Sequence, residues 1–431
     1  MQSFLARPLD RAESFFWFLD RCSSMNFAVL AEGTGPLEAS GLAAALDRAC
    51  RSHPALGVAI EADTAGRLAF VPRPDARAGF SREPGGDDWH ATLAARLAQP
   101  FGLGEAPLLR VHWFERPAGH WAFAVVFHHA IGDGRTGFRL VAELVQEASG
   151  GAARAAPISP QPSLMALVPE ALSGAAGEAL ARAWKDELRR EPLRPAPFPG
   201  FEREGGAPRP GIVAVRLEAP VVEGLVRRAR REGASVHGLI GAAELLAARD
   251  RFGEGDAPAL MLTSPVDLRG SLAQPLDDGT PGFCVTLLSS IRAVSGPGDF
   301  GALAKFLTDD LRRQVARGCG HLFYHLAPPA ESIPATAEGM AGFAAAMRRM
   351  PTALVLSNVG RVAPLAQAGG VQVEEISFAL CPMAHQPLFV AASTWNGRLA
   401  LNVVHDEGRL APEAARAMAG AMESLLRQAA D

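Results

Sequence analysis

Hydrophobic and polar residues follow two different periods along the first 150 residues. Helical spacing of apolar positions predicts helices over residues 41–51, 87–99 and 137–148. Two short, strongly apolar runs, residues 108–114 and 121–127, predict strands joined by a hairpin turn over residues 117–119. This part of the chain is therefore expected to combine a sheet with covering helices.

The middle of the chain has a different pattern. Residues 151–211 are rich in Pro and Ala and contain one amphipathic stretch, residues 174–190, which predicts a helix among prolines. We interpret this region as a connection between two halves. The expected organisation is an N-terminal lobe over residues 1–165, a connecting segment over 166–211 and a C-terminal lobe over 212–431.

The second half returns to mixed strand and helix signals. Ser235 is the expected N-cap of one of its helices, and Asn396-Gly397 is a strong signal for a two-residue hairpin turn. The predicted helices cover residues 221–232, 235–250, 339–349 and 414–428. The predicted strands cover residues 212–219, 259–266, 285–291, 352–357, 387–393 and 398–404. Both halves are thus of the α/β class.

Composition narrows the class of protein. With 431 residues, 48% hydrophobic and 20% charged, the chain is expected to fold into about two globular domains. A formal net charge of −4 offers no electrostatic case for binding nucleic acid. No uninterrupted apolar run reaches the length of a transmembrane helix or a signal peptide. Five widely spaced cysteines without a CxxC pair argue against a disulfide framework or a zinc site, and suit the reducing cytoplasm.

The strongest candidate chemistry lies in the segment His128-His129-Ala130-Ile131-Gly132-Asp133-Gly134. It follows an apolar strand and precedes a helix, so its side chains leave the strand end at a turn, where clefts form. A neutral imidazole is the usual base for an alcohol, amine or thiol near pH 7. Asp133 could fold back on the turn or pair with a cation, and Gly134 places a backbone N–H near a helix start, where dipoles favour negative charge.

Three other interpretations of the same segment compete with catalysis. The pair of histidines could simply be buried and hydrogen-bonded at a strand end. Two histidines and Asp133 could bind zinc or iron, although adjacent histidines rarely converge on one ion. A serine nucleophile would need a GxSxG elbow, which the sequence lacks. From these residues alone the structural interpretation would be favoured for an isolated pair of histidines.

Further motifs, in order along the chain, change this balance. The HHxxxDG pattern after an apolar strand resembles the signature of the chloramphenicol acetyltransferase-like superfamily, which includes condensation domains and many acyltransferases. Segments resembling other family motifs are residues 52–56 (SHPAL), 99–101 (QPF), 106–111 (APLLRV), 265–269 (PVDLR) and 357–360 (SNVG). The last segment is similar to the phthiocerol dimycocerosyl transferase and alcohol acetyltransferase branch. Phe283 departs from the family, which commonly has a GN step at this position.

The resemblance implies a fold and a set of roles. The fold would be two chloramphenicol acetyltransferase-like lobes, each a mixed sheet with helices, in a V-shape around a central tunnel. His129 matches the catalytic base and His128 a supporting position. Asp133 matches a structural carboxylate whose expected partner is Arg269. Ser357 and Asn358 fall near the tunnel and are candidate substrate contacts.

Three functions are compatible with this resemblance. The leading hypothesis is an acyltransferase that moves an acyl group from acyl-CoA or an acyl carrier protein to a small-molecule alcohol, without an acyl-enzyme. The second is a free-standing condensation enzyme that forms an amide or ester between carrier-bound substrates, with an amine as a possible acceptor. The third is a non-catalytic docking domain. We expect a monomer that needs no metal and no cofactor beyond the acyl-CoA or acyl-phosphopantetheine co-substrate.

Overall fold

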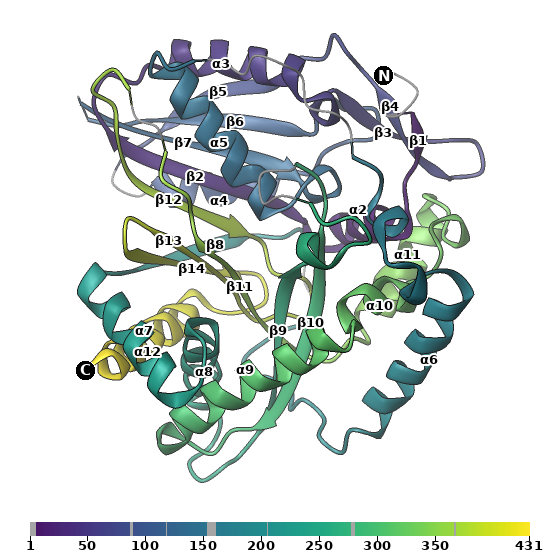
Figure 1. Ribbon diagram of the computed structural model, residues 1–431, viewed down its shortest axis with the longest axis vertical. Helices are drawn as coiled ribbons and strands as arrows, with labels where there is room; N and C mark the ends of the chain where they lie inside the picture. The colour runs from purple at the N-terminus through teal and green to yellow at the C-terminus, as the bar shows by residue number, and fades with distance from the viewer. Residues whose placement is uncertain are drawn as a thin grey trace.

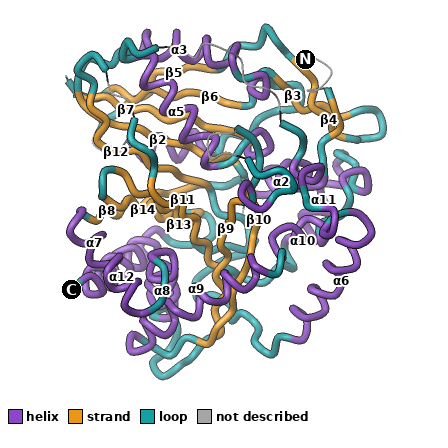
Figure 2. Tube along the Cα trace, in the orientation of Figure 1, coloured by secondary structure: helices purple, strands orange, loops and turns teal. Residues whose placement is uncertain are grey.

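The computed structural model describes residues 6–86, 89–117, 119–152, 161–204, 206–276, 281–365 and 368–431. Two large sheets, each with its own helices, lie one above the other in Figure 1. The tube view in Figure 2 shows the strands of both sheets running through the middle of the molecule and most helices outside them. Within these ranges, no helix has the length and apolar character needed to cross a bilayer.

The first sheet has five strands in the order β12-β2-β7-β6-β5. Its strands are β2 (Asn26–Thr34), β5 (Gly79–Pro84), β6 (Leu109–Glu115), β7 (His120–His128) and β12 (Gln372–Leu380). Within this sheet, β5 pairs with β6 in parallel, and the other neighbouring strands pair antiparallel. Alternate residues of β2 and β7 face opposite ways, so that Phe27, Val29 and Phe127 contact helix α5 (Gly134–Ala148) at Gly137. This apolar contact holds the helix that follows the histidine motif against the sheet.

The second sheet has six strands in the order β10-β9-β11-β13-β14-β8. Its strands are β8 (Pro210–Leu217), β9 (Ala259–Asp267), β10 (Val285–Ala293), β11 (Leu354–Arg361), β13 (Phe389–Trp395) and β14 (Arg398–Asp406). One face packs on four helices, α7 (Ala219–Glu232), α8 (Val236–Arg249), α9 (Phe300–Ala316) and α12 (Pro412–Ala430). Residues on the opposite face line the region between the two sheets.

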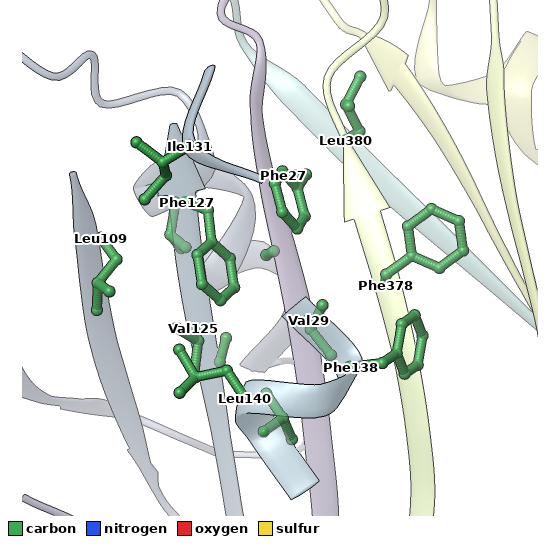
Figure 3. Close-up of a cluster of buried hydrophobic side chains, with 14 of the residues drawn as sticks. Phe27, Val29, Leu109, Val125, Phe127, Ile131, Phe138, Leu140, Phe378 and Leu380 are labelled. Atoms are coloured by element: carbon green, nitrogen blue, oxygen red, sulfur yellow. The ribbon is translucent and has the colours of Figure 1, made fainter. Parts of the chain in front are cut away.

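Strand β12 joins the two halves of the chain. It belongs to the second half in sequence, yet it pairs antiparallel with β2 in the first sheet, with Phe378 opposite Val29. Figure 3 shows Phe378 and Leu380 of β12 beside Phe27 of β2. Residues 212–431 therefore do not all belong to the second sheet and its helices. The boundaries at residues 165 and 211 stay predictions.

Most elements predicted from periodicity are present, and their ends shift by a few residues. The helix over Gly174–Arg190 (α6) has the predicted bounds, Ser235 caps α8 by accepting from the Gly238 N–H, and Asn396 and Gly397 turn the β13–β14 hairpin with positive φ. The elements not yet given are β1 (Arg7–Pro8), α2 (Arg11–Ser23), α3 (Ala39–Ser52), β3 (Val58–Ala62), β4 (Leu68–Pro72), α4 (Trp89–Leu97), α10 (Cys319–Leu326) and α11 (Ala337–Met347). Residues 87, 88 and 118, parts of one predicted helix and one predicted turn, lie outside the described residues.

Three α-helices of the described residues, α2, α9 and α10, were not predicted from the sequence. Helix α2 begins with a capping box, in which Asp10 accepts from the Glu13 N–H and Glu13 accepts from the Asp10 N–H. The spacing D-x-x-E before an apolar run was a usable signal for this start. Helix α9 is the longest of these three helices, and it packs beside α8 on the face of the second sheet that the helices cover.

Candidate active site

The histidine motif forms the connection between strand β7 and helix α5. The strand ends at His128, one turn of 3₁₀ helix covers His129–Ile131, and α5 begins at Gly134 with Asp133 as its N-cap. Asp133 caps the helix by accepting from the Thr136 N–H at 3.1 Å. The motif therefore lies at a strand end that opens into a turn, as its sequence predicts.

His128 is buried beneath the turn, with 1% of its surface exposed. Its Nδ1 accepts a hydrogen bond from the backbone N–H of Ala130 at 3.1 Å. A neutral ring that accepts at Nδ1 carries its proton on Nε2, which lies 3.8 Å from Oδ2 of the buried Asp20. These contacts hold the turn in place and are consistent with the supporting position predicted for His128.

His129 lies among aromatic side chains and is 8% exposed. Its ring centroid is 4.7 Å from that of Phe16, 4.9 Å from that of Phe27 and 5.7 Å from that of Phe283. Burial lowers the pKa of His129 to about 4, because the charged imidazolium loses its hydration, and the nearby Asp133 carboxylate only partly opposes this. His129 is therefore neutral at pH 7 and able to accept a proton.

Asp133 forms the ion pair with Arg269 that the resemblance predicted. Arg269 Nη1 lies 2.8 Å from Asp133 Oδ2 and Nη2 lies 3.1 Å from Oδ1, and the arginine is 1% exposed. Burial alone would lower the pKa of Arg269, but the charge of Asp133 and the hydrogen bonds to it raise the pKa overall. Oδ2 of Asp133 also accepts from the Cys284 N–H at 3.0 Å. The pair thus connects the motif in the first half to two segments of the second.

A cavity of about 120 Å³ borders His129. Because side chains alternate along a strand, Val355 and Ser357 of β11 face this cavity, whereas Leu354 and Leu356 pack in the core that the second sheet forms with its helices. Its apolar lining comes from both halves of the chain and comprises Phe16, Met25, Phe27, Pro265, Val285, Leu287, Val355, Val359, Phe378, Leu380, Met383 and Phe389.

Four charged side chains line the cavity, and they pair with one another. Arg269 contacts Asp133 and, at 2.9 Å, Asp267, while Arg135 Nε contacts the other oxygen of Asp267 at 2.8 Å. Their formal charges sum to zero within the lining. A neutral, apolar substrate group suits such a cavity, since a charged group would lose hydration there without gaining a dedicated counter-ion.

The remaining sequence-predicted site residues also border this cavity. Gly134 lies against Val359, and a Cβ built on the glycine would come 3.2 Å from Val359 Cγ1. Ser357 and Asn358 are consecutive, yet both line the cavity because a register shift after Asn358 interrupts the strand alternation. Asn358 Oδ1 accepts from the Gly360 N–H at 2.8 Å, and its NH₂ group carries two donors that a ligand could use.

The geometry bears on the metal interpretation of the motif. His128 lies against Phe101 and Asp20, while His129 lies against a different set of rings, so the two imidazoles do not share an environment. Both oxygens of Asp133 already accept hydrogen bonds from Arg269 and from backbone N–H groups. To bind one ion together, the two histidines and Asp133 would have to break these contacts and hydrogen bonds.

Some residues of the site were not assigned by sequence reasoning. Phe16 contacts His129 from α2, a helix that was not predicted. Thr136 accepts from the Gly282 N–H at 2.9 Å and links α5 to the segment before β10. In the sequence, Phe283 stands out only as a departure from the family pattern, and a large apolar residue in place of Asn is itself a signal of a changed site.

The lowered pKa of His129 predicts an unusual pH profile for any reaction in which it acts as base. The acidic limb of kcat/KM should have its midpoint near pH 4, well below the ordinary histidine value of about 6.5. The measurement is initial rate against pH, after brief exposure to each acidic buffer. A midpoint at pH 6.5 or above would contradict the assignment of His129 as the titrating base in this buried environment.

A stability control must accompany this profile. Burial also lowers the pKa of His237 and His385 to about 4. Between pH 4 and the unfolded-state value of about 6.5, the unfolded chain binds more protons than the folded one, so stability falls as pH falls through this window. Circular dichroism at each pH separates loss of structure from protonation of His129.

The sequence of this chain is similar to a family model and to one curated protein. Residues 206–404 match the family model described as the C-terminus of phthiocerol/phthiodiolone dimycocerosyl transferase. The nonribosomal peptide synthetase CymA of Salinispora arenicola is 27% identical over 249 residues, 53% of this chain. The aligned part is 3% of that much longer protein.

Solved structures match over the whole chain. Polyketide synthase associated protein 5 from Mycobacterium tuberculosis has a TM-score of 0.70 at 18% identity, covering 99% of this chain and 98% of that one. Trichothecene 15-O-acetyltransferase from Fusarium sporotrichioides has a TM-score of 0.75 at 13% identity, covering 98% and 95%. The first condensation domain of the calcium-dependent antibiotic synthetase has a TM-score of 0.70 at 17% identity, covering 99% and 97%. These similarities establish the fold.

Proposed function

We propose that the chain is a member of the chloramphenicol acetyltransferase-like superfamily and an acyltransferase that moves an acyl group from a thioester to a hydroxyl group, a proposal supported by the family-model match over residues 206–404 and by the shared fold. The observation that carries the proposal is His129, neutral and presented to an apolar cavity whose charged groups pair among themselves. A neutral alcohol suits that cavity better than an ammonium group, which would have to lose its proton and its hydration to enter.

In the proposed reaction, His129 takes the proton of the acceptor hydroxyl while the oxygen attacks the thioester carbonyl. The C–O bond forms as the carbonyl π electrons move to oxygen, giving a tetrahedral oxyanion. When the oxyanion collapses, the C–S bond breaks and the imidazolium returns the proton to the departing thiolate. No acyl-enzyme is required, because the thioester is already activated. General base catalysis of this kind contributes about 10²–10⁴-fold.

The oxyanion needs hydrogen-bond donors in the cavity. The Gly134 N–H is one candidate, since Gly134 opens helix α5 and lines the cavity. The hydroxyl of Ser357 and the amide of Asn358 are two others, supplied by the second half of the chain. His128, Asp133 and Arg269 support the geometry without touching the reacting atoms.

The donor would be acyl-CoA or an acyl carrier protein, each of which presents the acyl group on phosphopantetheine. The similar proteins include an acetyltransferase and condensation domains. The second candidate function, condensation of carrier-bound substrates into an amide or ester, is favoured by the similarity to CymA and to the condensation domains. The pairing of all four charges in the cavity supports the hydroxyl acceptor over the amine.

Thiol release tests the proposal directly. Purified protein is given acyl-CoA and acyl-carrier donors with pooled alcohols or pooled amines, and the products are identified by mass spectrometry. We expect thiol release that depends on alcohol and yields an ester. Amide products would replace the proposal with the condensation function, and no release from any pair by folded protein would favour the docking domain.

A further inference from the structure

Two cavities border the HHxxxDG turn in the described part of the chain. The first is the apolar cavity lined by Phe16 and His129. The second, of about 70 Å³, lies against Ala130 and Ile131 on the motif turn and is lined by Phe283. Its other lining residues mix apolar and polar side chains and comprise Arg7, Glu13, Ala55, Val58, Phe70, Gln161, Pro162, Leu164, Pro281 and Gly282.

Two aromatic rings that contact each other each line one of the cavities. The ring of Phe16 lines the first and the ring of Phe283 lines the second, and their centroids are 4.8 Å apart in an edge-to-face contact. Both rings also contact the ring of His129. Phe16 is 2% exposed and Phe283 is 7% exposed, so little open space remains around either ring. We propose that Phe283 limits the length of the aliphatic chain that can lie beside His129, by closing the second cavity off from the first.

The backbone holds Phe283 in this place from both sides. The preceding Gly282 donates its N–H to Thr136 Oγ1 at 2.9 Å, and its carbonyl accepts from Arg269 Nη2 at 3.0 Å. Gly282 has a φ of +150°, a conformation that other residues rarely adopt. On the other side, the Cys284 N–H donates to Asp133. The ion pair of Asp133 and Arg269 therefore positions the ring of Phe283 over the histidine.

The charged residues of the second cavity do not prevent an aliphatic chain from entering it. Glu13 accepts two hydrogen bonds from Arg7, at 2.7 and 2.6 Å, and the Arg7 guanidinium lies 5.2 Å from the centroid of the Phe70 ring. Their charges are thus satisfied by each other. The substrate class that follows is an unbranched, neutral aliphatic group, short in the natural protein and longer when Phe283 is removed.

This inference rests on the proposed acyl transfer, and its test compares chain lengths. Wild-type protein and the Phe283→Ala variant are assayed in two arms: saturated acyl-CoA donors of two to twelve carbons with one alcohol, and alcohols of the same range with one donor. Because each buried methylene contributes about tenfold or more to selectivity in an apolar pocket, the ratio of kcat/KM for long over short chains should rise at least about tenfold in one arm. The arm that responds identifies which substrate carries the chain.

Matched variants keep the result interpretable. Phe343→Ala removes the same ring from a buried position that contacts Phe15 and Phe18 and lines neither cavity, so it should leave the chain-length ratio unchanged. Phe283→Leu shortens the side chain with a smaller loss of packing. It replaces Phe283→Ala in the chain-length assay if that variant does not fold. An unchanged ratio in both arms with active Phe283 variants would overturn the inference.

A binding measurement distinguishes failure of this inference from failure of the proposed function. Decanol binding to the same proteins is measured by calorimetry, without any donor. Tighter binding by Phe283→Ala than by wild type and Phe343→Ala supports the joined cavity even if no turnover is found. Equal binding by all three, together with unchanged ratios, shows that Phe283 does not limit chain length.

Discussion

Replacing His129 with alanine is expected to remove nearly all turnover and leave the protein folded. The imidazole is the neutral base bordering the apolar cavity, and its loss leaves the acceptor hydroxyl without a proton acceptor. The expected decrease in kcat is about 10²–10⁴-fold. Thiol release with the best donor and acceptor pair measures it, and circular dichroism checks that the fold is retained.

A second histidine variant provides the control. His53 is also buried and contacts Glu143 at 2.7 Å, but it does not line the cavity that borders His129. His53→Ala should therefore keep most of the turnover, although it loses a buried contact. Near wild-type rates in His129→Ala would refute the assignment of the base.

The second large effect is expected on stability. Asp133→Ala leaves Arg269, which is 1% exposed, with a charge that has lost its closest partner. Breaking a buried ion pair on one side costs about 3–5 kcal/mol. Asp133 also caps helix α5 and accepts from the Cys284 N–H, so two hydrogen bonds from backbone N–H groups are lost as well. Chemical denaturation should show a correspondingly lower free energy of unfolding.

Two comparisons test whether this loss arises from the pair. Glu413→Ala breaks an ion pair with Arg416 on the exposed surface of α12 and should leave unfolding almost unchanged. The double variant Asp133→Ala with Arg269→Leu should lose less than the sum of the two single variants, because the buried charge that lost its closest partner is gone. Wild-type stability in Asp133→Ala would show that the ion pair contributes nothing to the fold.

The same substitution has a second consequence if Phe283 closes the second cavity. Without Asp133 the Cys284 N–H loses its acceptor, and Arg269, which binds the Gly282 carbonyl, loses its main partner. The segment that positions Phe283 is thereby loosened on both sides. Asp133→Ala should then shift the chain-length preference in the same direction as Phe283→Ala, measured at a temperature where both variants are folded.

Local sequence was sufficient for the elements that carry the motif. An apolar run that ends at two histidines, a glycine-bracketed turn and an Asp before a helix already predict strand β7, the turn and helix α5, because the hydrophobic pattern and the N-cap that indicate these elements lie within the segment itself. The hairpin at Asn396-Gly397 is of the same kind, since positive φ at both positions is a property of those residues. The partner of Asp133 came from the resemblance of the second half to a family.

Only the tertiary structure decided what surrounds the histidine. Strand β12 pairs with β2 across more than 300 residues of chain, and Phe16 and Phe283 meet at His129 from positions far apart in the sequence. Such contacts depend on how two sheets pack, which periodicity within a segment does not encode. The residues of HHxxxDG could thus be recognised from their order, whereas the cavity, its paired charges and the ring that divides it arise from packing between distant segments.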